Sequence, residues 1–153
     1  MQTFLPYENF NLSLEVLDYK RLGKQRVETH QLLNVLLGRT QTKGWRNHPI
    51  CKMWKGYENA LKLYFNKSLD TWIGRGYNNT MKYEDIEGDI VYPVWYGNKD
   101  FHNSHKANLL RKDYDFYSEY GWEESPKDPY VWYDTEKKKF YKHIVETGQK
   151  IYI

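Results

Sequence analysis

Charged side chains are concentrated between residues 17 and 28, in a stretch whose composition otherwise favours a helix. Four cations and two carboxylates fall in this stretch. Charged side chains are rarely buried, so a helix that is fully packed into a core would not carry this many. The segment therefore predicts a solvent-facing, positively charged surface. Residues 44–49 and 102–112 carry further cations, histidines and amides. Together the three segments predict a surface that handles a phosphate-bearing substrate.

Glu28 is the candidate general acid or base of this surface. The nearby cations Lys24 and Arg26 favour its ionised carboxylate. The simpler interpretation is an ion pair between Lys24 and Glu28 on a helix surface, where the i,i+4 spacing is worth only about 0.3–0.5 kcal/mol. The residues alone leave both interpretations open.

Two amines are candidate nucleophiles. α-Amines titrate at about pH 7.7–8.0, so an unmodified N-terminus such as that of Met1 is partly neutral and nucleophilic without help. Lys24 has the cationic neighbours Lys20, Arg21 and Arg26, which disfavour its charged form and can turn a lysine into a nucleophile. The simpler interpretation, which we prefer, is that Lys24 contacts phosphate.

Three histidines, His48, His102 and His105, could position a phosphate or transfer a proton near neutral pH. His102 and His105 have the spacing i,i+3, but no acidic side chain stands at a helical spacing beside them. The sequence therefore predicts neither a metal site nor a cofactor.

Length and composition limit the class of protein. A chain of 153 residues predicts one domain covering residues 1–153. The net charge of +3 is modest, so affinity for a polyanion must come from clustered cations. The single Cys51 excludes an internal disulfide and a cysteine-cluster zinc site, and is typical of a reducing compartment.

The sequence has neither a signal peptide nor an apolar stretch long enough to span a bilayer. We therefore expect a soluble cytoplasmic protein with no membrane contact and no obligate protein partner. Frequent Lys, Asn and Tyr are typical of AT-rich coding and compatible with a phage origin, in which case the protein works inside the host cell.

The first predicted helix carries the charged segment. It is expected to begin after Pro6, with Asn11 or Ser13 as its N-cap. Its apolar positions continue to a stop at Gly38, with a kink or break at Gly23. The cations would then surround an interruption, where backbone N–H groups are free to bind phosphate.

The clearest helix is predicted from about residue 49 to residue 73, because apolar residues recur there every three or four positions. Trp54 and Phe65 lie on that stripe and are expected to be buried. A loop-rich stretch at residues 77–99 and a shorter helix at residues 100–112 follow.

The tail differs from the rest of the chain. Residues 130–141 are expected to form a β-hairpin, with a last strand at residues 150–153. The predicted fold class is therefore mainly α: a compact, single-domain helical fold with a small C-terminal β-hairpin.

Four segments carry a resemblance to a known family: residues 1–7 (MQTFLPY), 21–28 (RLGKQRVE), 44–49 (GWRNHP) and 102–112. In this order they resemble the pyrimidine-dimer DNA glycosylase (endonuclease V) superfamily, and most of all its branch of small bacterial and phage proteins. The resemblance spans nearly the whole chain. It implies a mostly helical fold, double-stranded DNA as the substrate, and a DNA repair enzyme that cleaves an N-glycosidic bond, with strand scission by β-elimination as an associated lyase activity.

In phage-type members of that superfamily, the nucleophile is the N-terminal α-amine, and a glutamate flanked by arginines on the first helix assists it. This sequence departs from both features. Gln2 is bulky enough that Met1 is expected to be retained, and Leu22 follows Arg21 where the glutamate would stand. Glu28 is therefore the candidate carboxylate, with Met1, Lys24 and His48 as the other candidate catalytic residues.

The predicted DNA contacts combine cations with polar and aromatic side chains. Cations would supply affinity and register on the phosphate backbone without reading sequence. Trp45, Trp95 and Trp132 could stack on a flipped nucleotide, although each is individually better explained as core. The predicted contacts are Arg21, Gln25, Arg26, Trp45, Arg46, Asn47, His102, His105, Lys106, Arg111 and Lys112.

The sequence favours excision of a damaged or modified pyrimidine, either a pyrimidine dimer or a hypermodified base. Two other functions remain open. One is a nucleic-acid-binding module without chemistry, which the leucine in place of the expected glutamate favours. The other is a hydrolase for small nucleotides or nucleosides, for which the modest net charge is an argument.

Overall fold

The computed structural model describes residues 1–40 and 46–153, which form two compact units. Unit 1 comprises Met1–Phe4 and Asn9–Val94, and unit 2 comprises Leu5–Glu8 and Trp95–Ile153. The single domain predicted for residues 1–153 stays a prediction. No helix of the described residues is long and apolar enough to cross a membrane.

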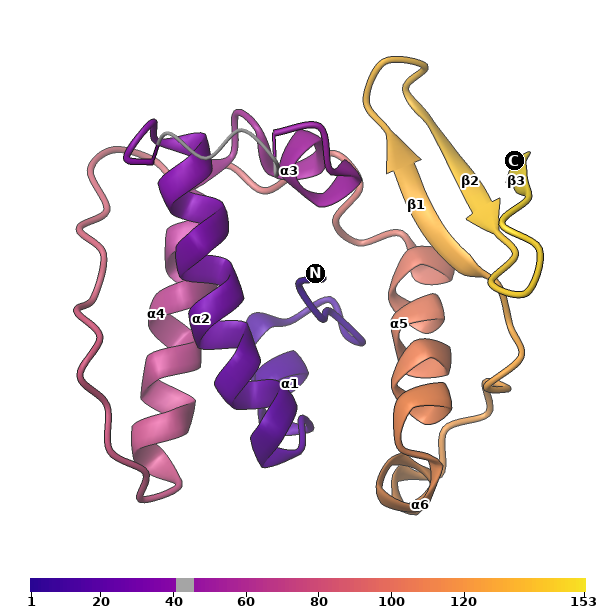
Figure 1. Cartoon of the computed structure of the whole chain (residues 1–153), viewed down its shortest axis with the longest axis horizontal. Coiled ribbons are helices and arrows are strands. Elements are labelled where there is room, and N and C mark those ends of the chain that lie inside the picture. Colours follow the sequence, from indigo (N-terminus) through magenta and orange to yellow (C-terminus); the bar gives the residue numbers. More distant parts are fainter. Residues whose placement is uncertain (41–45) are drawn as a thin grey trace. The chain divides into compact units, whose positions relative to one another are not determined.

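Unit 1 is helical. Its helices are α1 (Phe10–Glu15), α2 (Tyr19–Leu36), α3 (Pro49–Trp54) and α4 (Glu58–Gly74). The two long helices α2 and α4 pack side by side, and α4 also contacts α1 (Figure 1). The apolar faces of the four helices form a core that includes the fully buried Leu14, Leu22, Leu32, Leu33, Trp54, Leu61, Tyr64 and Phe65.

The charged segment lies on an uninterrupted helix, because α2 continues through Gly23. The predicted kink there is wrong. A Cβ atom at position 23 would lie 3.3 Å from the ring of Trp72, so the glycine lets α4 approach closely instead of breaking α2. The predicted stop is confirmed, since α2 ends at Leu36 and Gly38 has a φ of 69°.

The interruption falls earlier in the chain, between α1 and α2. Asn9 caps α1 by accepting the backbone N–H of Leu12, so the predicted caps Asn11 and Ser13 are wrong. Residues 16–18 separate α1 from α2. The cations of residues 20–26 therefore follow the break and stand on regular helix.

The long helix predicted for residues 49–73 is two helices. α3 ends at Trp54 and α4 begins at Glu58, and the turn between them contains Gly56 with a φ of 93°. A left-handed glycine reverses the local chain direction without strain, and apolar periodicity does not reveal it. The predicted burial of Trp54 and Phe65 is confirmed, since neither has exposed surface.

Residues 77–94 form no helix or strand, as predicted, and run alongside α4 (Figure 1). Side chains of α4 hold this segment by its backbone. Asn66 donates to the Glu84 carbonyl at 3.0 Å and accepts the Glu84 N–H at 2.8 Å, and Asn59 donates to the carbonyls of Glu87 and Asp89. The segment is thus ordered by side chain to backbone bonds in place of secondary structure.

Unit 2 contains α5 (Lys99–Lys112), α6 (Tyr114–Tyr117), the 3₁₀ turn η1 (Ser118–Tyr120), and strands β1 (Tyr130–Asp134), β2 (Lys139–His143) and β3 (Lys150–Tyr152). The strands form an antiparallel sheet in the order β1-β2-β3, with Trp132 opposite Tyr141. α5 packs on β1. The helix at residues 100–112, the hairpin and the mainly α fold class are confirmed.

Candidate active site

The N-terminal segment of unit 1 is held by buried side chains. Gln25 of α2 donates from Nε2 to the carbonyl of Gln2 at 2.9 Å, and its Oε1 accepts the N–H of Phe4 at 3.0 Å. The Tyr64 hydroxyl of α4 lies 2.9 Å from the Phe4 carbonyl and 2.7 Å from Gln25 Oε1. Gln25 and Tyr64 have no exposed surface. Gln25, which was expected to contact DNA, therefore holds the N-terminus in this structure.

The side chain of Thr3 adds a further attachment. Its Oγ1 accepts the indole N–H of Trp54 at 3.0 Å, and Trp54 is itself fully buried. Residues 2–4 are thus bound to side chains of α2, α3 and α4. Met1 directly precedes these attached residues.

Glu28 stands one turn after Gln25 on α2. Burial is the main reason why the pKa of the Tyr64 hydroxyl lies well above its usual value, and the negative charge of Glu28 raises that pKa further. The carboxylate is therefore within electrostatic range of the hydroxyl that holds Phe4. No ion pair joins Glu28 to Lys24 among the described residues, although the simpler interpretation predicted one.

His48 lies at the start of α3 and close to the N-terminus. Its Nδ1 accepts the N–H of Ile50 at 3.1 Å and so caps the helix. Burial lowers the pKa of His48, and the positive charge of the Met1 ammonium lowers it further. His48 is thus within electrostatic range of the Met1 ammonium, and Glu28 is within electrostatic range of the Tyr64 hydroxyl that holds Phe4.

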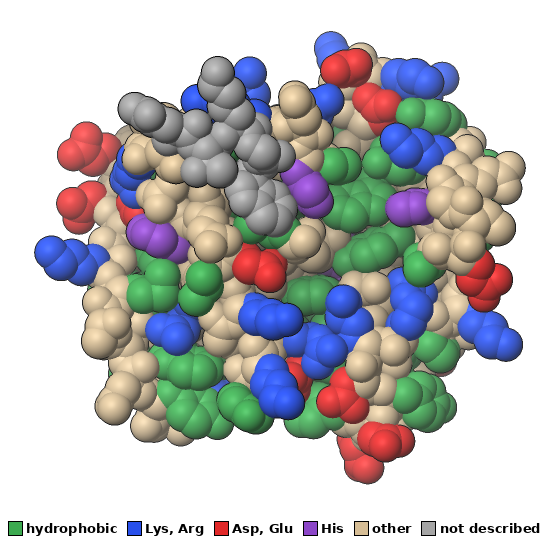
Figure 2. Space-filling model, in the orientation of Figure 1, with side chains coloured by type: hydrophobic (Ala, Val, Ile, Leu, Met, Phe, Trp, Pro, Cys, Tyr) green, Lys and Arg blue, Asp and Glu red, His purple; other side chains and the backbone are tan. Residues whose placement is uncertain are grey.

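Lys24 is exposed on α2 and lines a groove with a cavity volume of about 510 Å³. Lys20, Glu28 and the ring of Trp72 line the same groove. Figure 2 shows Lys and Arg side chains gathered over the N-terminal half of α2 on the face in view. The positively charged surface expected for α2 is therefore present, with Glu28 at the groove.

Two of the predicted phosphate contacts on α2 already have protein partners. Arg21 forms an ion pair with Asp18 at 3.1 Å. The guanidinium of Arg26 lies 4.1 Å from the ring of Trp72 and donates to Asn79 Oδ1 at 2.9 Å. Burial lowers the pKa of Arg26. Arg26 therefore links α2 to α4 and to the segment that follows α4.

The motif at residues 44–49 is described only from Arg46 onward, and Trp45 lies outside the described residues. Arg46 and Asn47 are exposed immediately before His48. They remain candidate DNA contacts beside the N-terminus.

The histidines of α5 face the interior of unit 2. Nδ1 of His105 accepts the N–H of Leu5 at 2.8 Å, and Nδ1 of His102 lies 2.7 Å from the Leu5 carbonyl. Nε2 of His102 accepts the N–H of Gly97, so the neutral ring carries its proton on Nδ1 and donates to Leu5. Both rings are buried and cannot reach a phosphate in this conformation. The predicted DNA contact by these two histidines is replaced by a structural one.

The cations of α5 also have partners. Lys106 lies 3.9 Å from a carboxylate oxygen of Glu124 and 4.8 Å from the ring centroid of Tyr7. Arg111 donates to the carbonyl of Pro126 at 2.7 Å and to Asn108 Oδ1 at 2.8 Å. Lys112 is exposed. Because Arg111 and Arg21 belong to different units, the prediction that they share one surface stays a prediction.

Trp95 and Trp132 are buried, as the core interpretation predicted. Within residues 1–40 and 46–153, no group of three or more His, Cys, Asp or Glu side chains could hold a metal ion.

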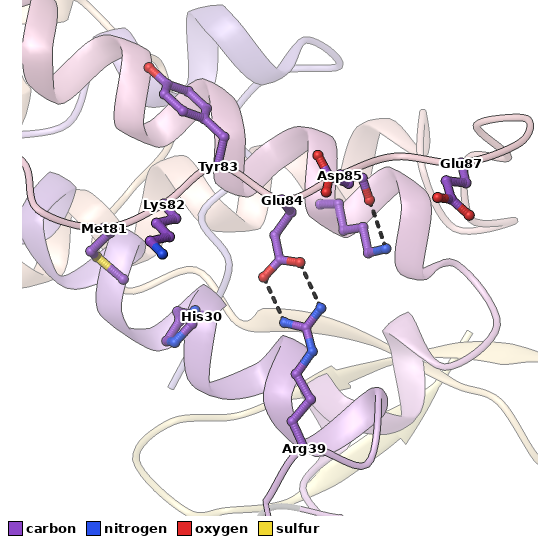
Figure 3. A pocket seen from close by; sticks show the side chains of 9 residues that line it. His30, Arg39, Met81, Lys82, Tyr83, Glu84, Asp85 and Glu87 are labelled. Carbon is purple, nitrogen blue, oxygen red and sulfur yellow. Dashed lines mark hydrogen bonds and ion pairs between the residues drawn. The ribbon is translucent and has the colours of Figure 1, made fainter.

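A second cavity of unit 1, of about 540 Å³, was not expected from the sequence. It lies between the C-terminal half of α2, α4 and residues 81–87, and Figure 3 shows Arg39 and Glu84 joined across it. Their two hydrogen bonds measure 2.7 and 2.8 Å, and the hydrogen bond to Arg39 is the main reason why the pKa of the Glu84 carboxyl lies below its usual value. The pair ties the chain just after α2 to the segment beside α4, and no sequence motif marks it because the two residues are far apart in the chain.

Comparison with known proteins identifies the family of the chain. A family model described as pyrimidine dimer DNA glycosylase matches residues 1–85, which include the N-terminal segment, Gln25, Glu28, His48 and Tyr64. No curated protein and no solved structure matches the chain. The match covers more than half of the chain but not residues 102–112, where a resemblance was also expected. The chain belongs to the pyrimidine dimer DNA glycosylase family.

Proposed function

We propose that this protein excises a damaged or modified pyrimidine from double-stranded DNA, with Met1, Glu28 and His48 as its catalytic groups. One observation carries the proposal: the N-terminal segment is bound through Gln25 to the helix that bears Glu28, while the Met1 ammonium is close enough to lower the pKa of His48. An amine and a carboxylate near one another are what base excision by a covalent route requires.

In the covalent route, the neutral Met1 amine attacks C1′ of the damaged nucleotide. The N–C1′ bond forms as the bond between C1′ and the base breaks, and the base leaves with a proton. Glu28 is the group that exchanges protons with the amine and the sugar. The neutral ring of His48 places no second positive charge beside the amine, because its pKa is lowered.

The C1′–O4′ bond of the sugar then breaks, O4′ takes up a proton and the nitrogen loses one. The resulting imine supports strand scission. Loss of a proton from C2′ breaks the C3′–O bond by β-elimination, and hydrolysis of the imine then returns the free amine. In the alternative route, Glu28 activates a water molecule that attacks C1′, and no covalent intermediate forms. We hold these bifunctional and monofunctional routes as equal alternatives.

A screen of substrates with borohydride trapping tests the proposal. The substrates are duplexes with pyrimidine dimers, with uracil or with hypermodified bases, together with plain duplex and free nucleotides. Base release from one modified duplex supports the proposal, and a trapped peptide containing Met1 identifies the amine. Intact mass of the purified protein must first establish that Met1 is its N-terminal residue.

The other outcomes separate the alternatives. Trapping at Lys24 would transfer the nucleophile to α2, and base release without trapping supports the water route. Binding without release favours a nucleic-acid-binding module, for which the fully buried Leu22 at the position after Arg21 is the supporting observation. Hydrolysis of free nucleotides alone would overturn the proposal.

A further inference from the structure

Gln25 is buried at a cost that its contacts must offset. The side chain has no exposed surface, and an apolar residue of similar size would avoid the desolvation of a carboxamide. Its donor and its acceptor are both used, by Gln2, Phe4 and Tyr64. A polar side chain placed and satisfied in this way specifies one arrangement of its partners.

The two backbone contacts of Gln25 reproduce those of a neighbouring β-strand. The carboxamide donates to the carbonyl of Gln2 and accepts from the N–H of Phe4, the two groups on either side of Thr3. A residue in a parallel strand forms the same pair of bonds with its partner strand. A slip of the segment by one residue would present the opposite edge of the backbone and break both bonds.

Tyr64 and Trp54 hold the same register from other directions. The Tyr64 hydroxyl lies 2.9 Å from the Phe4 carbonyl, and the Trp54 indole N–H donates to Thr3 Oγ1 at 3.0 Å. Both side chains are fully buried. Three consecutive residues of the N-terminal segment are thereby attached to helices, and Met1 directly precedes them.

We propose that Gln25, supported by Tyr64, is a positioning residue for catalysis, which fixes the register of residues 2–4 and thereby places the Met1 amine at the reacting sugar. The inference rests on the proposed function, in which that amine is the nucleophile. It assigns Gln25 no contact with DNA.

The central test replaces Gln25 with methionine, which has similar length, no hydrogen-bond donor and only a weak acceptor in its sulfur. A misplacement of about 1 Å at a reacting group costs about 100-fold in rate, so Gln25→Met should lower kcat by about 100-fold. The dissociation constant for DNA should change by less than about twofold, because Gln25 is buried. Tyr64→Phe should lower kcat in the same direction by a smaller factor.

Ser68→Ala is the matched control. Ser68 is fully buried on α4 in the same unit, and its hydroxyl donates to the Phe65 carbonyl away from the N-terminal segment. The variant therefore loses a buried hydrogen bond without touching residues 1–4. It should keep kcat. An equal loss of kcat in both variants would overturn the positioning role, because stability alone would then explain it.

A glutamate variant supplies a signature that a merely structural role does not produce. The carboxylate of Gln25→Glu has no donor for the Gln2 carbonyl, whereas its protonated form has one donor and one acceptor, like the carboxamide. Burial favours the protonated form. The kcat of Gln25→Glu relative to wild type should therefore rise as the pH falls from about 8 to about 5.5. A ratio that does not change with pH counts against the proposal.

Hydrogen exchange at the Phe4 amide tests the positioning independently of catalysis. Its N–H loses its acceptor in Gln25→Met, so exchange should accelerate there and stay unchanged in Ser68→Ala. The rate of acylation of the Met1 amine by an N-hydroxysuccinimide ester should change in the same variant. If wild-type protein releases no base, the proposed function fails, and these two measurements still decide whether Gln25 places the N-terminus. Unchanged exchange in Gln25→Met would overturn the inference while leaving the proposed function intact.

Discussion

His105 accepts the backbone N–H of Leu5 through Nδ1 at 2.8 Å, inside unit 2 and without exposed surface. The adjacent turn of α5 supplies His102, whose Nδ1 donates to the carbonyl of the same leucine at 2.7 Å. Two histidines thereby satisfy both backbone groups of one residue near the N-terminus. The arrangement requires both rings to be neutral, since a proton on Nδ1 of His105 would face the Leu5 N–H and a proton on Nε2 of His102 would face the Gly97 N–H.

We expect the stability of the protein to fall as the pH is lowered below about 6.5. Burial, followed by the charge of His102, lowers the pKa of His105 well below its usual value, so the unfolded chain takes up the proton first. This contribution to the free energy of unfolding is fully present above the pKa that His105 has in the unfolded chain. It is lost as the pH falls toward the pKa of His105 in the folded protein, by about 1.4 kcal/mol per pH unit for one proton.

Urea unfolding at several pH values measures this slope. His102, with a pKa lowered mainly by burial, contributes in the same direction, so His105→Asn is the comparison that isolates one ring. Asparagine offers an acceptor near the position of Nδ1 and does not titrate. In His105→Asn, the free energy of unfolding should change less with pH between about pH 6.5 and pH 5, by the amount that corresponds to about one proton. An identical pH dependence in wild type and variant would contradict the assignment.

Truncation of Phe65 should destabilise unit 1 strongly. Its ring has no exposed surface, and Phe65→Ala removes a buried aromatic side chain and leaves a cavity, at a cost of about 3–5 kcal/mol. Ile73 on the same helix is 45% exposed, so Ile73→Ala is the control and should change the free energy of unfolding far less. A thermal midpoint unchanged in Phe65→Ala would show that this face of α4 is not core.

Substitution of Arg46 should separate DNA affinity from stability. Arg46 is exposed beside His48, so Arg46→Ala should change the free energy of unfolding by less than about 0.5 kcal/mol. If about five phosphates are neutralised, the logarithm of the association constant for duplex DNA should fall with the logarithm of the salt concentration, with a slope near −4 to −5. Arg46→Ala should reduce the magnitude of that slope by about 1.

Arg26→Ala is the contrasting variant for this measurement. Arg26 stacks on Trp72 and donates to Asn79, so its loss should lower stability by about 1–2 kcal/mol. Binding that does not depend on salt, in wild type or in Arg46→Ala, would count against the phosphate-binding surface.

Glu28→Gln should abolish turnover while DNA affinity is retained. The substitution removes the acid/base group and leaves the shape of the side chain nearly unchanged, so the loss should appear in kcat and not in the dissociation constant. Single-turnover base release and a binding titration measure the two quantities. A parallel loss of affinity would instead make Glu28 a binding residue.

The spacing of apolar residues along the chain was sufficient to predict the elements that pack through a regular apolar stripe. Trp54 and Phe65 recur at helical spacing and are buried, α5 begins within one residue of its predicted start, and the hairpin has the predicted strands. The period of apolar residues reports which face of an element meets the core, and that information is contained in neighbouring residues. Where one glycine reverses the chain, as Gly56 does between α3 and α4, the stripe continues across the break and conceals it.

By itself, the sequence determined the mainly helical fold class, the charged face of α2 and the family, because composition, spacing and motif are local properties of the chain. Only the tertiary structure decided the roles of Gln25 and His105. Each is a polar residue on a helix that carries cations, yet each is buried against backbone near the N-terminus. Gln25 binds the N–H of Phe4, 21 positions away, and His105 binds the N–H of Leu5, 100 positions away. Whether a polar side chain faces solvent or a distant segment depends on which elements pack together. Every residue except proline offers the same backbone groups, so the residue types of the N-terminal segment do not reveal which side chain binds its backbone.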